Sequence, residues 1–277
     1  MFVRHVALVT EELNVPVRQL TRVAAALQKQ VTRDFAPIWE VKANVSAFTS
    51  FDDVPSDYWP VVVVEDVKGA AGVHEDQDGQ PFALVEFGQD WSLTASHETL
   101  EMLGDPFGRR LVAGQSSKPG QGRVQFLVEV CDPSEAAEFG YTVNGIPVSD
   151  FYTPHFFDPE VATSVRYSFT GAIKAPRQVL RGGYLSWHDP VTDHWFQQTF
   201  FGSSPEFRDL GRLTQSGSSH RTSLRSVIDS KTPEGRKFTR TVADGRANLL
   251  RAAGDTSDQS SGARAKSLRA QIAALRK

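Results

Sequence analysis

Apolar residues along the first two hundred positions follow two different periods, and these periods predict where helices and strands lie. Between residues 16 and 32 they recur every three or four positions, which predicts an amphipathic helix. Elsewhere they form short, β-branched or alternating runs bounded by turn residues, and such runs predict strands. The sequence thus predicts strands at 3–9, 39–45, 59–64, 81–87 and 124–130, a second helix over 91–103, and hairpins over 141–151 and 184–201. This mixture of elements predicts an α+β fold.

The character of the chain changes after Gly202. From Ser203 onward Ser, Gly, Thr and Arg dominate, and fifteen Lys and Arg stand against seven Asp and Glu, whereas the earlier residues carry an excess of eleven acidic side chains. We therefore predict a folded domain over 1–202 and a basic, largely disordered tail over 203–277. Within the tail, three apolar residues fall on one face of a predicted short amphipathic helix: Leu268, Ile272 and Leu275.

Composition narrows the class of protein. The 277 residues are 40% hydrophobic, enough for a core, and the single cysteine, Cys131, excludes an intrachain disulfide. No window approaches about 18 unbroken apolar residues, which argues against a membrane span. The first residues do not resemble a secretory signal, so we expect a cytoplasmic protein, with signal-independent export or association with a particle left open. Phosphate-binding loops and serine-nucleophile elbows are absent from the sequence.

The segment His97-Glu98-Thr99-Leu100-Glu101 carries the strongest chemical signal in the chain. His97 and Glu101 project from one face of the predicted helix about one turn apart, where an imidazole and a carboxylate can hold one ion. Zinc accepts both ligand types. Glu98 follows the first ligand, at the position where a zinc hydrolase keeps the carboxylate that takes a proton from water. A five-residue match to a zinc-binding motif also arises by chance, so the surrounding residues decide whether this segment is a metal site.

Three carboxylates are candidates for a third metal ligand. Asp105 follows Gly104, and it approaches the ion only if the helix breaks at that glycine; the alternative is that Asp105-Pro106 is simply a helix stop. Glu129 and Asp132 come at the end of the strand 124–130. Either could ligate the metal or form a hydrogen bond that orients His97. The alternative is that this segment is a turn at the end of the strand with a solvated Asp.

Four segments together resemble a known family of uncharacterised bacterial and phage-associated proteins. They are Gly69-x-x-Gly72-x-His74, Ser96-His97-Glu98-x-x-Glu101-x-x-Gly104-Asp105-Pro106, Glu129-x-x-Asp132-Pro133 and Ser149-Asp150-Phe151. The run from His97 to Gly104 is also similar to the active-site helix of metzincin-type zinc peptidases. The resemblance covers about residues 3–200 and implies a zincin-like fold, in which a mixed sheet and an active-site helix are followed by β-hairpins. The two further histidines and the Met-turn of metzincins are missing from this chain.

Two kinds of function fit these features. The first is a zinc-dependent hydrolase of the metallopeptidase kind, in which His97, Glu101 and a third ligand hold zinc and Glu98 is the general base. The second is a non-catalytic zincin-like binding or assembly module with a structural or absent metal. The missing histidines favour the second, because they put peptidase activity in more doubt than metal binding.

The first function predicts where a substrate would bind. In zincins an edge strand pairs with an extended peptide substrate. We expect 81–87 to be this edge strand, because Pro81 lacks a backbone N–H. His74 precedes it and would contact the substrate, unless it is an exposed loop residue.

The basic tail predicts a partner of a different kind. Residues 215–277 would dock on an acidic protein surface, or they form a solvated extension without a partner. Nucleic acid would be bound without specific readout, because aromatic side chains that stack on bases are scarce there.

Overall fold

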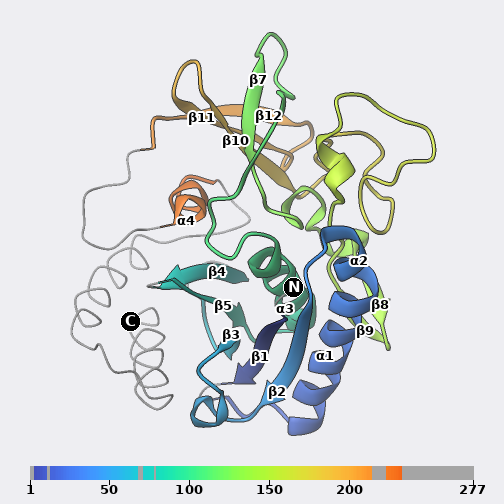
Figure 1. The fold of residues 1–277 in the computed structure, drawn as a ribbon, viewed down its shortest axis with the longest axis vertical. Helices are drawn as coiled ribbons and strands as arrows, with labels where there is room; N and C mark the ends of the chain where they lie inside the picture. The colour runs from blue at the N-terminus through green and yellow to red at the C-terminus, as the bar shows by residue number, and fades with distance from the viewer. Residues whose placement is uncertain (1–2, 11–12, 68–70, 78, 214–222, 233–277) are drawn as a thin grey trace.

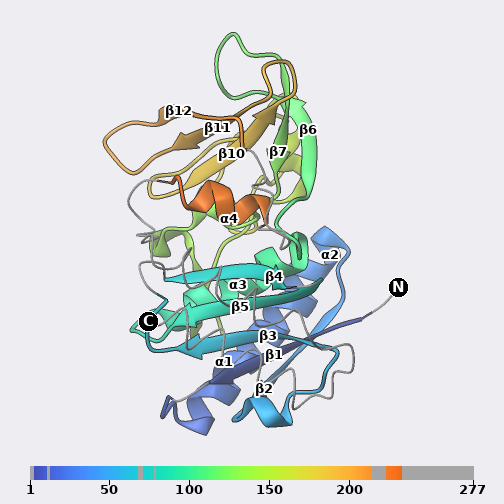
Figure 2. The same cartoon turned by 90° about the vertical axis from the view of Figure 1, so that its left-hand side faces the viewer.

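The computed structural model describes residues 3–10, 13–67, 71–77, 79–213 and 223–232, and it shows an α+β protein built on two five-stranded sheets (Figure 1). One sheet is mixed and the other is antiparallel. Turned by 90°, the two sheets lie one above the other, with helix α4 (Leu224–Asp229) between β4 (Gly72–Gln77) and the second sheet (Figure 2). The predicted fold class is therefore confirmed at the level of α+β.

The first sheet has the strand order β2-β1-β3-β5-β4. Four strands are parallel, and β4 alone runs antiparallel, paired with β5. Both faces of β1 and β3 are buried, because their apolar runs are continuous rather than alternating. The remaining bounds are Arg4–Thr10 (β1), Ala43–Phe48 (β2), Tyr58–Val64 (β3) and Gln80–Glu86 (β5).

Helices α1 (Val17–Lys29) and α3 (Trp91–Gly104) cover one face of this sheet and share its main hydrophobic core. The chain after α1 continues through a π-helical turn, Gln30–Phe35, into the short helix α2 (Ala36–Trp39). Glu40 ends α2 in the left-handed conformation at φ 56°. The predicted strand 39–45 therefore starts later, at β2, because Trp39 completes the helix and packs in the core.

The edge of the first sheet differs from the prediction. The segment 72–86 forms a hairpin, so β5 lies between β3 and β4, and β4 is the edge strand. Pro81 is accommodated at the start of β5, where it opposes Asp76 near the hairpin turn. His74 therefore does not precede the edge strand but lies within it. A short strand of mostly polar residues has no long apolar run for a sequence pattern to detect.

The second sheet has the order β12-β11-β10-β7-β6. The predicted hairpin at 184–201 is present as β10 and β11, and the hairpin at 141–151 is present as β8 and β9. β6 lies in a segment for which the sequence analysis predicts neither a helix nor a strand. The strands are Leu111–Gln115 (β6), Arg123–Leu127 (β7), Tyr141–Val143 (β8), Ile146–Val148 (β9), Tyr184–Asp189 (β10), His194–Thr199 (β11) and Glu206–Gly211 (β12), with short 3-10 turns at Phe51–Asp53, Asp132–Ser134, Ala137–Phe139 and Pro154–Phe157.

Part of the predicted tail belongs to the folded body. β12 pairs with β11, and Leu210 packs with Ile228 of α4 in a small core beside the second sheet. These elements lie beyond the predicted boundary near residue 203, and their apolar residues are too few to mark them in the sequence. The predicted carboxyl-terminal helix lies outside the described residues. Within the described ranges, no helix has both the length and the apolar character needed to span a bilayer.

Candidate metal centre

Helix α3 is fixed in the core by a polar residue rather than by a capped end. The Ser96 hydroxyl donates to Gln30 Oε1 at 2.8 Å and accepts from the backbone N–H of Ser149 at 2.9 Å. The Gln30 side chain in turn donates to the Ser149 carbonyl at 3.0 Å. Asp90 is the residue at the N-cap, without a side-chain capping bond. This buried network sets the rotation of α3, and with it the direction of His97.

Gly104 brings α3 close to the segment that follows β7. A Cβ atom at this position would lie 3.1 Å from Val130 Cγ1, tighter than ordinary contact. The chain stops being helical at Asp105, as the sequence predicts, but Gly104 itself remains in the helix. Its function in the structure is therefore close packing, which allows Cys131 and Asp132 to approach the helix.

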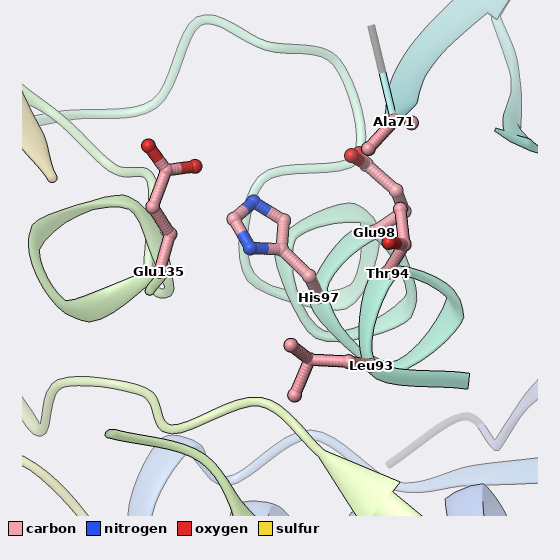
Figure 3. A pocket seen from close by; sticks show the side chains of 7 residues that line it. Ala71, Leu93, Thr94, His97, Glu98 and Glu135 are labelled. Atoms are coloured by element: carbon pink, nitrogen blue, oxygen red, sulfur yellow. The ribbon is translucent and has the colours of Figure 1, made fainter. Parts of the chain in front are cut away.

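His97 is the centre of a buried group of ligand-type side chains. Its Nε2 atom lies 3.3 Å from Glu101 Oε2 on the next turn and 3.3 Å from Asp132 Oδ1 after β7. Its ring projects into a pocket between Glu98 and Glu135 (Figure 3). The surrounding His, Cys, Asp and Glu atoms form several groups within 4.8 Å that could hold a metal ion, among them His97 with Asp132 and Glu135, and His97 with Glu101 and Cys131.

The carboxylates determine the charge of the His97 ring. Burial lowers its pKa, but the charge of Glu101, hydrogen bonds to Asp132 and Glu101, and the charge of Glu98 together outweigh burial and hold the pKa well above its usual range. A histidine that ligates a metal must be neutral. Ion binding at His97 would therefore release a proton from the ring.

Glu98 lies between the pocket and strand β4. Its carboxylate is packed against Gly72, where a Cβ atom would come within 2.8 Å of Oε1. The pocket that it lines has a volume of about 200 Å³, and Ala71, Gly72, Leu93, Thr94, His97 and Glu135 complete the lining. Glu98 thus has a position beside His97 with access to a small molecule such as water.

His74 is buried at 1% exposure, in contrast to the alternative of an exposed loop residue. Its Nε2 atom lies 3.1 Å from the Asp105 carbonyl oxygen. A neutral ring that donates to this carbonyl presents Nδ1 as an acceptor. Nδ1 lies 3.5 Å from Glu98 Oε2 and 3.6 Å from Glu101 Oε2, so the three side chains form another group with metal-ligand spacing.

The Asp105 carboxylate is directed toward the loop that follows α3. It accepts the backbone N–H of Arg110 at 2.6 Å and that of Phe107 at 3.4 Å. Burial raises its pKa to about 6, against the opposing effect of these hydrogen bonds. Among the described residues, the groups with metal-ligand spacing include Asp132 once with His97 and Glu135 and once with Glu101 and Glu129, and none of them includes Asp105. These contacts favour the helix-stop interpretation.

Glu129 and Cys131 are less suited than Asp132 to hold a metal ion. Burial, with the charges of Glu101 and Asp132, raises the pKa of Glu129 well above its usual range. Burial likewise raises the pKa of the Cys131 thiol, which disfavours the thiolate that binds metals. The Cys131 backbone N–H instead donates to Glu101 Oε1 at 3.2 Å and orients that carboxylate.

The sequence prediction missed two charged residues at this centre. Glu135 lies across the pocket from His97 (Figure 3). Its position three residues after Asp132, across a short 3-10 turn, was the available signal. Arg225 enters from α4, in the segment that the sequence predicts as a tail, and no local pattern indicated it.

Comparison with known proteins does not place the chain in a family. No family model matches it, and no curated protein and no solved structure shows significant similarity. A buried His/Glu cluster around α3 with the capacity to hold a metal ion is therefore established by the geometry alone.

Proposed function

We propose that this chain is a zinc-dependent hydrolase of the zincin type, with zinc held by His97, Glu101 and Asp132 and with Glu98 as general base. One observation carries the proposal: His97 Nε2 lies 3.3 Å from an oxygen of each of the other two ligands. Atoms bonded to one tetrahedral zinc ion at about 2.0–2.1 Å lie about 3.3–3.4 Å apart. An imidazole and two carboxylates are also a donor set that zinc accepts.

The arrangement of elements supports the same class. In zincins an edge strand beside the metal-binding helix pairs with the substrate, and here α3 packs against β5 and the edge strand β4. Among the described residues β4 pairs only with β5, so its other edge could accept an extended peptide. We therefore propose a peptide as the substrate.

The chain's own residues divide the chemistry between them. Zinc, when bound, would act as a Lewis acid and lower the pKa of a water molecule. Glu98 would take a proton from the attacking water as the water oxygen bonds to the peptide carbonyl carbon, and would pass that proton to the leaving amine as the C–N bond breaks. Gly72 leaves the space in which the Glu98 carboxylate lies, and Cys131 holds Glu101 through its backbone N–H.

The first test is the metal content of the purified chain. We expect about one zinc per wild-type chain after equilibration with Zn²⁺ and desalting, and loss of this zinc in His97→Ala, because the variant removes the central donor. The measurement is mass spectrometry of bound metal. His188→Ala, which alters a histidine on the second sheet, is the matched control and should keep the zinc. Equal zinc in His97→Ala and wild type would rule out the proposed site.

The third ligand can be tested with two matched amide variants. Asp132→Asn should lower zinc affinity by about tenfold or more, because it replaces a charged ligand beside His97. Asp105→Asn should leave the affinity within about twofold, because its carboxylate accepts backbone hydrogen bonds instead. Competition with a fluorescent zinc chelator measures both. The reverse order of effects would make Asp105 the ligand and contradict the assignment of Asp132.

A second candidate function is a non-catalytic module with a structural metal. It is favoured by Glu135, which forms a group with His97 and Asp132 and could complete a closed shell of protein ligands. Structural zinc sites are closed in this way, whereas catalytic sites keep an open position. X-ray absorption at the zinc edge distinguishes the two: four protein ligands would support the module, and three with one water would support the hydrolase.

A further inference from the structure

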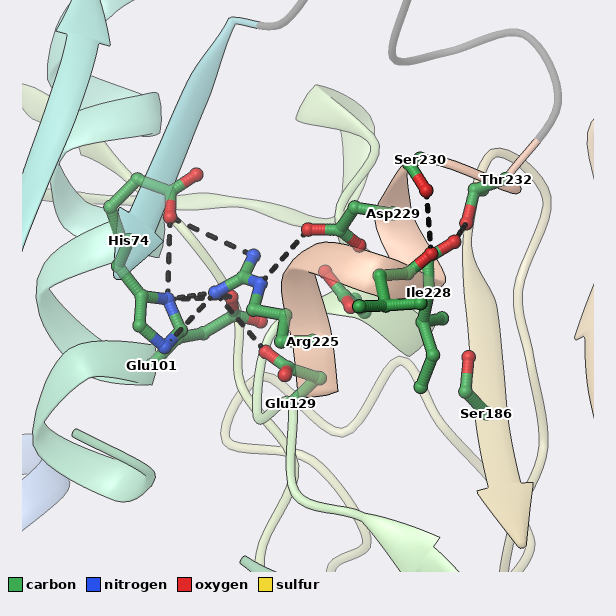
Figure 4. Close-up of polar contacts among 12 residues, drawn as sticks. His74, Glu101, Glu129, Ser186, Arg225, Ile228, Asp229, Ser230 and Thr232 are labelled. Carbon is green, nitrogen blue, oxygen red and sulfur yellow. Dashed lines mark hydrogen bonds and ion pairs between the residues drawn. The ribbon is translucent and has the colours of Figure 1, made fainter. Parts of the chain in front are cut away.

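Helix α4 inserts a cation into the acidic side of the candidate metal centre. Arg225 is 1% exposed, and its guanidinium points from α4 toward His74 and Glu101 (Figure 4). The helix is held in place independently of these charges. The Arg225 backbone N–H donates to the Gly108 carbonyl at 3.0 Å, and Ile228 packs in the small core beside the second sheet.

The guanidinium contacts the same atoms that could hold a metal ion. Its Nη1 atom lies 2.8 Å from Glu101 Oε2 and 3.2 Å from Glu129 Oε2, and Nη2 lies 3.7 Å from Glu98 Oε2. It also donates to Nδ1 of His74. On its own helix, Asp229 accepts from Nε at 3.2 Å and orients the side chain. Arg225 therefore makes the contacts with these carboxylates that a bound cation would make.

One oxygen is shared between the two parts of the centre. Glu101 Oε2 lies 2.8 Å from Arg225 Nη1 and 3.3 Å from His97 Nε2. A zinc ion bonded to this oxygen at about 2.0–2.1 Å would lie at most about 5 Å from the guanidinium nitrogen. Two cations so close in a buried site repel each other strongly, because little water is present to screen them.

We propose that Arg225 is an internal competitor for the metal ion, and that segment 223–232 is a removable cover of the centre. This inference rests on the proposed zinc site. With Arg225 inserted, the guanidinium balances the charge of Glu101 and Glu98. Zinc binding and insertion of Arg225 oppose each other, and the coupling is reciprocal: withdrawal of the segment raises zinc affinity, and zinc drives the segment out.

The test is a Zn²⁺ titration of the full chain by calorimetry, comparing wild type with Arg225→Met. The methionine keeps much of the apolar side-chain volume and removes the charge. We expect the Kd for zinc to fall by at least about tenfold in Arg225→Met. Arg212→Met removes the same charge from an exposed position and should leave the Kd unchanged. In the double variant Arg225→Met/His97→Ala the tight binding should disappear, because His97 supplies the central ligand.

The possible results separate the two proposals. If the Kd for zinc in Arg225→Met equals or exceeds that of wild type, and zinc still binds through His97, Arg225 does not compete with zinc. The proposed zinc site would then remain valid. No zinc binding by either protein overturns both.

A second measurement uses only the wild-type chain and so does not depend on how a variant folds. Trypsin cleaves after arginine, and it can reach the Arg225–Ser226 bond only when α4 leaves its buried position. We expect zinc to increase cleavage at this bond at least about threefold, read by mass spectrometry of the peptides, in accordance with reciprocal coupling. Cleavage after the exposed Arg212 serves as the internal reference. Zinc binding without any increase at Arg225 would contradict the displacement of the segment.

Discussion

Glu98→Gln is expected to lower peptide hydrolysis by about 100- to 10,000-fold while the bound zinc remains, because a positioned general base contributes a factor of this size. The amide keeps nearly the same shape between α3 and Gly72 but cannot take a proton at neutral pH. Glu98 is not among the three proposed ligands, so the metal content should not change. Cleavage of a mixed peptide library, followed by mass spectrometry, measures the loss whichever peptide sequence the protein cleaves.

The matched control for Glu98→Gln is Glu138→Gln, which makes the same chemical change at an exposed carboxylate. It should cleave the library at the wild-type rate. If Glu98→Gln cleaves as fast as wild type, Glu98 is not the base. If the zinc-loaded wild-type protein cleaves no peptide in the library, the hydrolase proposal is contradicted and the non-catalytic module with a structural metal is favoured.

Asp105→Asn is expected to stabilise the metal-free protein above about pH 6. Burial raises the pKa of Asp105 from 3.8 to about 6, so the folded protein holds this proton more tightly than the unfolded chain does. Stability from this group is therefore present below about pH 4 and is lost as the pH rises to about 6. A shift of about two pH units corresponds to roughly 3 kcal/mol. The asparagine is neutral throughout and does not lose this contribution.

The measurement for Asp105→Asn is urea unfolding in the presence of a chelator at several pH values between 4 and 7. The free energy of unfolding of the variant, minus that of wild type, should rise by up to about 3 kcal/mol across this interval. Using the change with pH, rather than one value, separates ionisation from the altered hydrogen bonds to Arg110 and Phe107. Asp53→Asn, at an exposed carboxylate, is the control. A difference that does not vary with pH would mean that Asp105 titrates alike in the folded and unfolded chains.

The proposed zinc site and the proposed closure by Arg225 require different protonation and charge states of the residues in the centre. As a zinc site it needs a neutral His97 and ionised Glu101 and Asp132. As a centre closed by Arg225 it needs the carboxylates to be balanced by the guanidinium. Both demands involve Glu101, because its two oxygens contact His97, Arg225 and the Cys131 backbone. We therefore regard Glu101 as the residue through which metal binding and the position of α4 are coupled.

Local sequence patterns were enough to predict those helices and strands that depend on residues close together in the sequence. The period of the apolar residues predicted α1 and α3, and short apolar runs bounded by turns predicted β1, β3, β5 and the two hairpins. The spacing of four residues was enough to place His97 beside Glu101, because one helical turn separates them whatever the rest of the fold. The same reasoning identified Glu98 and the stop at Asp105.

Only the tertiary structure decided which distant residues meet at this helix. Asp132 reaches His97 because Gly104 packs closely on Val130, and His74 is buried because the 72–86 hairpin makes β4 the edge strand. Arg225 lies more than a hundred residues from His97 in sequence, on a helix of six residues that is too short to show a helical period of apolar side chains. Contacts of this kind depend on the packing of whole elements and on the balance of buried charge, and neither leaves a period in the sequence.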